Sequence, residues 1–355
     1  MRQWRSVLSV RSLHILLIHI LLLSLFGCQS VGEYVDASNA TTSAGSDVST
    51  SPSDVTTISP TLTFTPEATH TPMPTPTATP TPLPTPTPFV CTEQMGTTIR
   101  DTFISGAMQT EEIRYTVYVP PCYSNYREHR FPTLYLLHGW PMDEMHWEKL
   151  GIIRIMDAWI SQGLIGPMIV VLPGVSNPHG MYINSSGGDY SFEGMIVNEL
   201  VPRVDERYRT WDEPEGRAIG GISRGGVWAL EIGFRHPDLF GRVGGHSPAL
   251  SVNHPLPAYD PFVLVESVGP AQRIYLSVGD QDWARAWTIR LRDSLQEVGA
   301  NVTYQLHEGS HIDDLWRLGL PEYVHFYARD WPHDVEDLPS YSIRMPSSKP
   351  DDNFQ

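Results

Sequence analysis

Basic residues and cysteine are both scarce in this chain. Its 355 residues include 24 Lys and Arg against 40 Asp and Glu, which gives a formal net charge of −16 at pH 7. This balance argues against nucleic acid as a partner, because phosphate binding depends on clustered basic side chains. Cys91 and Cys122 have no histidine or second cysteine at the spacing of a zinc site. The sequence also lacks an internal repeat, a phosphate-binding loop and an H-E-x-x-H motif. We therefore expect neither a metal site nor a cofactor.

Long hydrophobic runs are also scarce. The apolar stretch Ile15–Phe26 has about a dozen residues, which is short for a membrane-spanning helix. Arginines precede it and Gly27-Cys28 follows it, as in a signal peptide. A small residue before cysteine at this place resembles the bacterial lipobox, in which the cysteine is acylated and becomes the new N-terminus. We predict a lipoprotein signal over residues 1–28, lipidation at Cys28 and an extracytoplasmic, membrane-anchored location; the alternative is an uncleaved signal anchor.

Composition divides the rest of the chain. Residues 29–90 are rich in Ser, Thr and Pro without apolar periodicity, which predicts a disordered, extended tether. Residues 91–345 suit one domain with a large core, and residues 346–355 are predicted to be a disordered tail. In an exported protein the pair Cys91 and Cys122 favours a disulfide, with two free thiols as the alternative.

The pentapeptide Gly221–Gly225 carries the clearest chemical signal. It has the form G-x-S-x-G, follows the apolar run Arg217–Gly220 and precedes the helix-like segment Gly226–Phe234. A serine on such a strand-to-helix turn projects above the sheet, and the flanking glycines leave room for the turn. We interpret Ser223 as a nucleophile; the alternative is a Gly/Ser-rich structural turn.

A nucleophilic serine needs a base and an orienting acid, and along such chains the serine is followed first by the Asp or Glu and then by the His. His311 follows the strand-like run Val302–His307 and is the predicted base. Asp280 and Asp282 both follow the strand-like run Arg273–Val278. We favour Asp282 as the acid, although it also suits a helix N-cap, and we expect Asp280 to be a turn former.

The oxyanion of such a reaction needs two backbone N–H groups. One is predicted at Arg224, directly after the serine. The other is predicted in the loop after the strand Phe131–Leu137. Trp140 is the expected donor because Pro141 has no N–H. His138 precedes the serine and is expected to brace this loop.

The remaining pattern alternates strands and helices. Thr133–Leu137 and Met168–Leu172 are apolar runs typical of buried parallel strands, and residues 113–119 alternate as in an antiparallel region. Ile152–Ile160 and Trp283–Val298 are helix-like. We predict an α/β fold with a mainly parallel sheet flanked by helices.

Together these segments resemble the esterase family of α/β-hydrolases, which includes feruloyl and acetyl-xylan esterases, enterochelin esterases, S-formylglutathione hydrolase and the antigen 85 mycolyltransferases. The resemblance runs from about Thr97 to Tyr327. The motifs that carry it are Arg114–Pro121, Leu134–Gly139, Asn198–Asp205, Tyr208–Thr210, Arg217–Gly226, His236–Phe240, Gly279–Asp282, and Gly309–His311 with Trp316.

The resemblance implies an α/β-hydrolase fold and a serine esterase, with departures at two positions. The family commonly has an apolar residue where Arg224 stands. Its guanidinium would either favour an anionic substrate or enter an ion pair. Trp228 stands where smaller residues are common and suggests altered packing.

The predicted function is hydrolysis of a carboxylic ester, on extracellular acylated carbohydrate or similar esters, through an acyl-enzyme. Alternatives are a mycolyltransferase-like acyl transfer to a sugar hydroxyl and a non-catalytic, tethered binding module. Substrate contacts are expected from residues in loops near the serine, with ordinary loop packing as the other interpretation. These are Trp140, Met142, Trp147, Tyr182 and Asn184.

Overall fold

The structure is a computed structural model that describes residues 89–175, 180–181, 187–252 and 255–340. Cys28, nearly all of the expected tether, the expected tail, Tyr182 and Asn184 lie outside these residues. Among the described helices, none has the length and apolar character needed to cross a bilayer.

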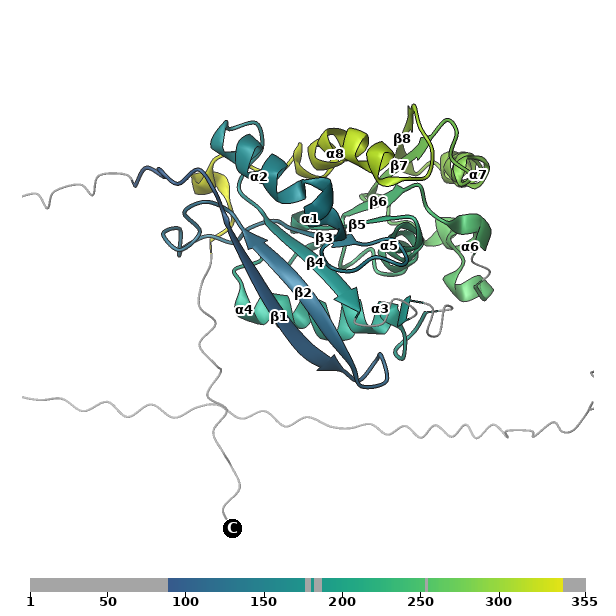
Figure 1. Cartoon of the computed structure of the whole chain (residues 1–355), viewed down its shortest axis with the longest axis horizontal. Coiled ribbons are helices and arrows are strands. Elements are labelled where there is room, and N and C mark those ends of the chain that lie inside the picture. Colours follow the sequence, from purple (N-terminus) through teal and green to yellow (C-terminus); the bar gives the residue numbers. More distant parts are fainter. Residues whose placement is uncertain (1–88, 176–179, 182–186, 253–254, 341–355) are drawn as a thin grey trace, which may run out of the picture. The chain divides into compact units, whose positions relative to one another are not determined.

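An eight-stranded sheet with the order β1-β2-β4-β3-β5-β6-β7-β8 forms the centre of the domain (Figure 1). β1 pairs antiparallel with β2, and β2 with β4, whereas the pairs from β4 through β8 are parallel. The strands are β1 Thr97–Ser105, β2 Glu111–Val119, β3 Thr133–Leu137, β4 Ile169–Val175, β5 Arg217–Ile222, β6 Arg242–His246, β7 Arg273–Gly279 and β8 Asn301–His307. The predicted α/β fold with a mainly parallel sheet is confirmed.

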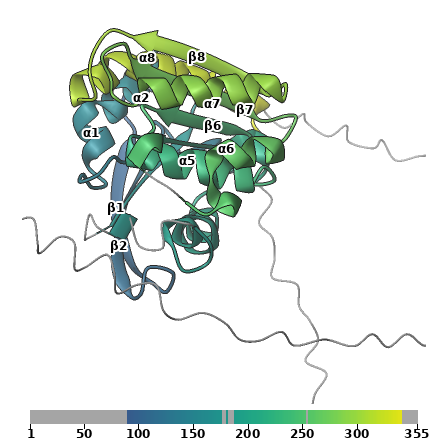
Figure 2. The same cartoon turned by 90° about the vertical axis from the view of Figure 1, so that its right-hand side faces the viewer.

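Helices cover both faces of this sheet, and α6 lies beside α5 (Figure 2). The helices are α1 His146–Leu150, α2 Ile152–Ser161, α3 Phe192–Gly194, the π-helix Met195–Leu200, α4 Val201–Arg207, α5 Arg224–Arg235, α6 Pro261–Leu264, α7 Arg285–Glu297 and α8 Asp313–Ala328. Short 3-10 turns occupy Pro214–Gly216, Leu250–Val252, Pro257–Tyr259, Val265–Ser267 and Val335–Asp337.

The side chains of β3 show how the two faces separate. Tyr135 and Leu137 point into a core shared with α3 to α7, whereas Leu134 and Leu136 point into a second core shared with α1, α2 and α8. All four are buried because a central parallel strand is covered on both faces. This continuous burial explains why the apolar run was recognisable as a strand.

The predicted disulfide is present. Cys91 and Cys122 are bonded with their Cα atoms 5.8 Å apart, across 31 residues of sequence. Because Cys122 follows β2 closely, the bridge attaches the first described residues to the antiparallel edge of the sheet. It limits the freedom of the unfolded chain over that loop.

Candidate active site

Ser223 occupies the turn between β5 and α5 in a backbone conformation that is rare for a residue with a side chain, with φ of 55° and ψ of −114°. Its N–H donates to the carbonyl of His246 on β6 at 2.9 Å. Only glycine fits at two neighbouring positions. A Cβ at Gly221 would lie 2.2 Å from the carbonyl oxygen of Gly225, and a Cβ at Gly225 would lie 2.4 Å from that of His138. Backbone packing therefore fixes this strained turn and the direction of the serine hydroxyl.

His311 connects Ser223 to Asp282, as the sequence pattern requires of a base. Its Nε2 lies 2.8 Å from Ser223 Oγ, and its Nδ1 lies 2.8 Å from Asp282 Oδ1. Because the carboxylate accepts a hydrogen bond from Nδ1, Nδ1 carries the proton and Nε2 is free to accept the serine proton. The arrangement can deprotonate the hydroxyl and stabilise the imidazolium that results.

Asp282 is buried at the end of the turn after β7. Its Oδ1 also accepts the N–H of Ala284 at 2.8 Å, just before α7 begins. Burial acts to raise the pKa of this carboxyl, but the hydrogen bonds from His311 and the Ala284 N–H, together with the nearby Ser247 hydroxyl, outweigh it, and the pKa lies below its usual range. Asp282 is therefore ionised at neutral pH. The N-cap of α7 is Ala284, so Asp282 forms the turn before the helix rather than its N-cap, and the N-cap interpretation is wrong.

Asp280 has a different position. Its Oδ1 accepts the N–H of Gly309 at 2.9 Å, and Gly309 has φ of 139°. The carboxylate thereby ties the turn after β7 to the loop that carries His311. This is the turn-forming role expected of Asp280, and the contact with the imidazole belongs to Asp282.

Two tryptophans hold the imidazole of His311. Trp283 stacks against it with ring centroids 4.3 Å apart and an interplanar angle of 36°, and Trp316 packs edge-on at 5.1 Å and 84°. The sequence pattern links Trp316 to this loop but does not indicate Trp283 as a partner. Its position next to Asp282 was the only signal.

The loop after β3 lies against the serine turn. A Cβ at Gly139 would lie 3.4 Å from Ser223 Cβ, so Gly139 lies next to the serine. Trp140 is the next residue in the chain. The side chains of Trp140 and Met142 are 44% and 38% exposed. His138 is buried and its Nδ1 donates to the carbonyl of Gly139 at 3.0 Å. Burial lowers the pKa of His138 to about 4, so it stays neutral and braces the loop.

The side chain of Arg224 contacts Met181 and Trp228. Its Nε and Nη2 donate to the carbonyl of Met181 at 3.3 and 3.2 Å, and its guanidinium lies 5.0 Å from the ring centre of Trp228. Trp228 Nε1 donates to the same carbonyl at 2.9 Å. Arg224 is buried, and the two unusual residues both bind the chain at Met181.

Trp147 was wrongly predicted as a substrate contact. It is 1% exposed, its Nε1 donates to the carbonyl of Leu137 at 3.0 Å, and its ring packs edge-on against His246. The indole belongs to the core because α1 packs its apolar face on the sheet. Tyr182 and Asn184 lie outside the described residues, so their predicted contacts stay predictions.

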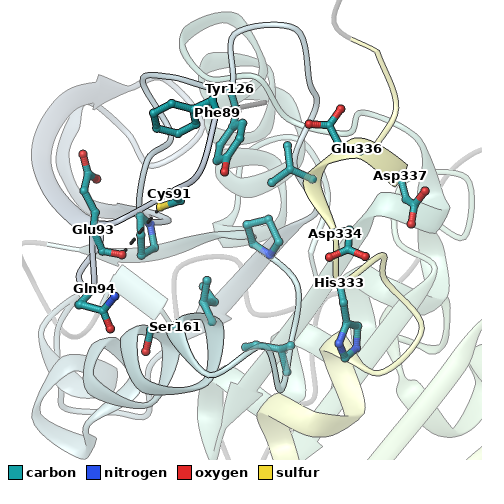
Figure 3. A pocket seen from close by; sticks show the side chains of 15 residues that line it. Phe89, Cys91, Glu93, Gln94, Tyr126, Ser161, His333, Asp334, Glu336 and Asp337 are labelled. Carbon is teal, nitrogen blue, oxygen red and sulfur yellow. Dashed lines mark hydrogen bonds between the residues drawn. The ribbon is translucent and has the colours of Figure 1, made fainter. Parts of the chain in front are cut away.

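A pocket of about 450 Å³ lies beside the disulfide (Figure 3). Its lining includes Phe89, Tyr126 and Glu336 and none of Ser223, Asp282 and His311. Within the described part of the chain, no group of three His, Cys, Asp or Glu side chains is placed to hold a metal ion. The nucleophile, base and acid come together at the serine turn and not in this pocket.

Three comparisons with known proteins show what this chain is similar to. A family model described as "Putative esterase" matches residues 105–332. An endo-1,4-beta-xylanase/feruloyl esterase of Xylanibacter ruminicola is 35% identical over 147 residues, 39% of this chain and 19% of that protein. An acetyl esterase of Caldicellulosiruptor saccharolyticus is 24% identical over 237 residues, 58% of this chain and 84% of the relative. A solved ferulic acid esterase has a TM-score of 0.58 at 23% identity, covering 66% of this chain and 98% of that structure.

These similarities differ in what they establish. The match to the Xylanibacter protein spans only 19% of its length, and the likeness to the solved structure establishes the fold alone. The family model covers more than half of this chain, from the end of β1 to beyond α8. The chain therefore belongs to the esterase family, on an α/β-hydrolase fold.

Proposed function

We propose that this chain is a serine hydrolase of carboxylic esters, with Ser223 as nucleophile, His311 as general base and acid, and Asp282 as the residue that orients the imidazole. One observation carries the proposal. The hydroxyl, imidazole and carboxylate form an unbroken hydrogen-bonded series, with 2.8 Å at each link. This geometry serves to activate a serine hydroxyl.

The reaction proceeds in two halves. Ser223 Oγ attacks the ester carbonyl carbon while His311 Nε2 takes the hydroxyl proton, and the N–H groups of Arg224 and Trp140 stabilise the oxyanion. Collapse of this intermediate breaks the bond to the alcohol, which leaves with the proton from His311. Water then attacks the acyl-enzyme, gives its proton to His311 and releases the acid. Ser223 finally recovers the proton.

Extracellular acylated carbohydrate is the substrate class we favour. Three features support it: the name of the Xylanibacter relative, which includes a feruloyl esterase, the exposed rings and thioether near the serine at Trp140 and Met142, and the export signal with Cys28. Lipid attached at Cys28 would keep the enzyme outside the cell while the tether lets it reach large esters.

Labelling with a fluorophosphonate tests the nucleophile. We expect the folded full chain to be labelled at Ser223, as mapped by mass spectrometry, because only an activated serine reacts. Ser223→Ala should abolish labelling, and Ser124→Ala, at an exposed serine far along the chain, should leave it unchanged. Absence of label on a chain shown to be folded would contradict the assignment and favour a binding module.

A further inference from the structure

A pocket of about 650 Å³ lies at the amino ends of the parallel strands β6 and β7. Its lining includes two arginines, which begin these strands, and two tryptophans: Arg242, Arg273, Trp211 and Trp331. Ser223 instead follows the carboxyl end of β5, which runs parallel to β6. The pocket and the candidate active site therefore lie at opposite ends of the strands.

The two arginines of this pocket stand side by side. Arg242 and Arg273 are partners in the parallel register of β6 and β7, so their side chains leave the sheet on the same face. Asp330 forms ion pairs with both Arg273 and Arg329. One carboxylate thus serves two guanidinium groups beside a third, and like charges repel each other at this end of the sheet.

Arg242 is the guanidinium without an acid in contact. It is 6% exposed, and no Asp or Glu of the described residues forms an ion pair with it. Its Nη1 donates to the carbonyl of Glu215 at 2.6 Å, and the group lies 4.6 Å from the ring centre of Trp331. Its Nε has no hydrogen-bond partner within the same part of the chain.

The side chain of Arg242 nevertheless carries its charge at neutral pH. Burial is the main cause that lowers its pKa to about 10, and repulsion by Arg273 and Arg329 adds to the shift. The carboxylate of Glu215 opposes the shift without forming an ion pair. A buried charge is costly unless an anion pairs with it, so the surroundings of Arg242 favour an anionic ligand.

The walls of the pocket indicate the rest of the ligand. A guanidinium offers parallel N–H groups that match the oxygens of a carboxylate or a phosphate. Beside the arginines, the pocket has apolar surface from the indoles of Trp211 and Trp331 and from Pro214, Pro237 and Pro270. Indole faces pack well on a planar ring. A ligand that fits therefore combines an acid group with an apolar ring.

We propose that this pocket binds a small organic anion, whose carboxylate or phosphate group contacts Arg242 and whose planar ring packs between the two indoles. The ligand would supply the negative charge that Arg242 lacks, and Arg273 would add attraction from the neighbouring strand. The pocket shares no residue with the series of Ser223, His311 and Asp282. The proposal is therefore independent of the proposed function.

Fluorine NMR of the full chain, labelled with 5-fluorotryptophan and assigned by Trp→Phe substitution, tests where the anion binds. The probes are benzoate and phenyl phosphate. We expect one or both to shift the resonances of Trp211 and Trp331, and the tighter probe identifies the acid group. Acetate lacks the ring and benzyl alcohol lacks the acid, so each should bind at least about tenfold more weakly.

Arg242→Gln tests the acid contact. We expect its Kd for the tighter probe to rise by about tenfold or more, because a charge-assisted hydrogen bond is lost. The matched control is Arg317→Gln, which removes an arginine of α8 that pairs with Asp314. Its Kd should equal that of the wild type. An unchanged Kd in Arg242→Gln would overturn the proposal.

The spectra of the wild type also decide the proposal if Arg242→Gln does not fold. Shifts confined to Trp140 and Trp283 would show that the anions bind at the candidate active site, and would overturn the proposal. Absence of any shift would overturn it as well. The same holds if acetate or benzyl alcohol binds as tightly as benzoate and phenyl phosphate.

Discussion

Backbone packing holds the serine turn, whereas the histidine side of the site adds side-chain carboxylates to such packing. At the turn, backbone atoms pack so closely that Gly221 and Gly225 have no room for a side chain. At the other side, near the edge of the sheet, side-chain hydrogen bonds of Asp280 and Asp282 hold the turn after β7 and the loop of His311. Backbone also packs closely on that side, since a Cβ at Gly279 would lie 2.1 Å from the carbonyl oxygen of Gly309. The histidine side therefore differs in the carboxylates that it adds to backbone packing.

Because of this difference, substitutions in the two regions are expected to affect stability and catalysis to different degrees. Substitution in the serine turn must move backbone, so it is expected to damage the fold and the activity together. Substitution of the carboxylates at the sheet edge leaves the backbone in place and is expected to change the rate alone. The two regions therefore predict different ratios of lost activity to lost stability.

The largest effect is expected from Gly221→Ala. The new Cβ would lie 2.2 Å from the carbonyl oxygen of Gly225, a backbone atom that cannot turn aside. We expect loss of detectable ester hydrolysis together with a destabilisation of about 3 kcal/mol or more, as for overpacked cores. Thermal unfolding and ester hydrolysis measured on one preparation test this.

Gly106→Ala is the matched control. Its Cβ would meet only Glu199 Oε1, at an ordinary 3.4 Å, and the residue lies in the β1–β2 turn away from the serine. Activity should persist in this variant, and stability should change by less than about 1 kcal/mol. Full activity in Gly221→Ala would mean that the serine turn tolerates a backbone shift, contrary to the comparison.

A large loss of rate without loss of fold is expected from Asp282→Asn. An amide at this position stabilises the wrong tautomer of His311 and cannot offset the charge of the imidazolium. A fall in kcat of about 10⁴ follows by analogy with other triads. Asp280→Asn keeps an oxygen that can accept from Gly309, so its kcat should fall by about tenfold at most. Equal kcat values for the two variants would show that Asp282 is not the acid.

The sequence predicted the central strands well because both faces of the sheet are covered. Thr133–Leu137 is strand β3 as predicted, whereas the prediction for β4 stopped at Leu172 and the strand continues to Val175 through Pro173. The helix predicted from Trp283 begins at Arg285. Its first two residues form the turn that carries Asp282, and no periodicity marks that boundary.

The catalytic residues were predictable because their order along the chain is characteristic. The roles of the tryptophans were less predictable because they depend on packing. Ser223, Asp282 and His311 follow each other along the chain in a fixed order, and the structure brings them into contact. Trp147 and Trp283 could not be distinguished by composition. Trp147, on α1, is buried against the sheet and Trp283 is half-exposed beside His311, because burial depends on contacts between segments far apart in the sequence.

The smallest expected effect concerns α5, the helix that follows the serine. Glu231 on α5 is buried, and its carboxylate oxygens have no hydrogen-bond partner among the described residues. Burial, and then repulsion by Glu193, raise the pKa of Glu231 to about 9 against the opposing pull of Arg224 and Arg235. The folded chain therefore keeps a proton on Glu231 over a range of pH where the unfolded chain has lost it.

The sign of the pH dependence follows from this difference in bound protons. Between the ordinary glutamate pKa and about 9, the unfolded state binds fewer protons, so the stability of the folded state falls as pH rises. One such group contributes about 1.4 kcal/mol per pH unit. Glu231→Gln should flatten the decline of Tm between about pH 7 and pH 8.5, a window above the ordinary titration of histidine, while kcat changes little. Glu266→Gln, which removes an exposed carboxylate, measures the general effect of losing a negative charge. If both variants decline as steeply as the wild type, Glu231 is ionised in the folded chain, and the helix after the serine holds a buried charge as well as tight packing.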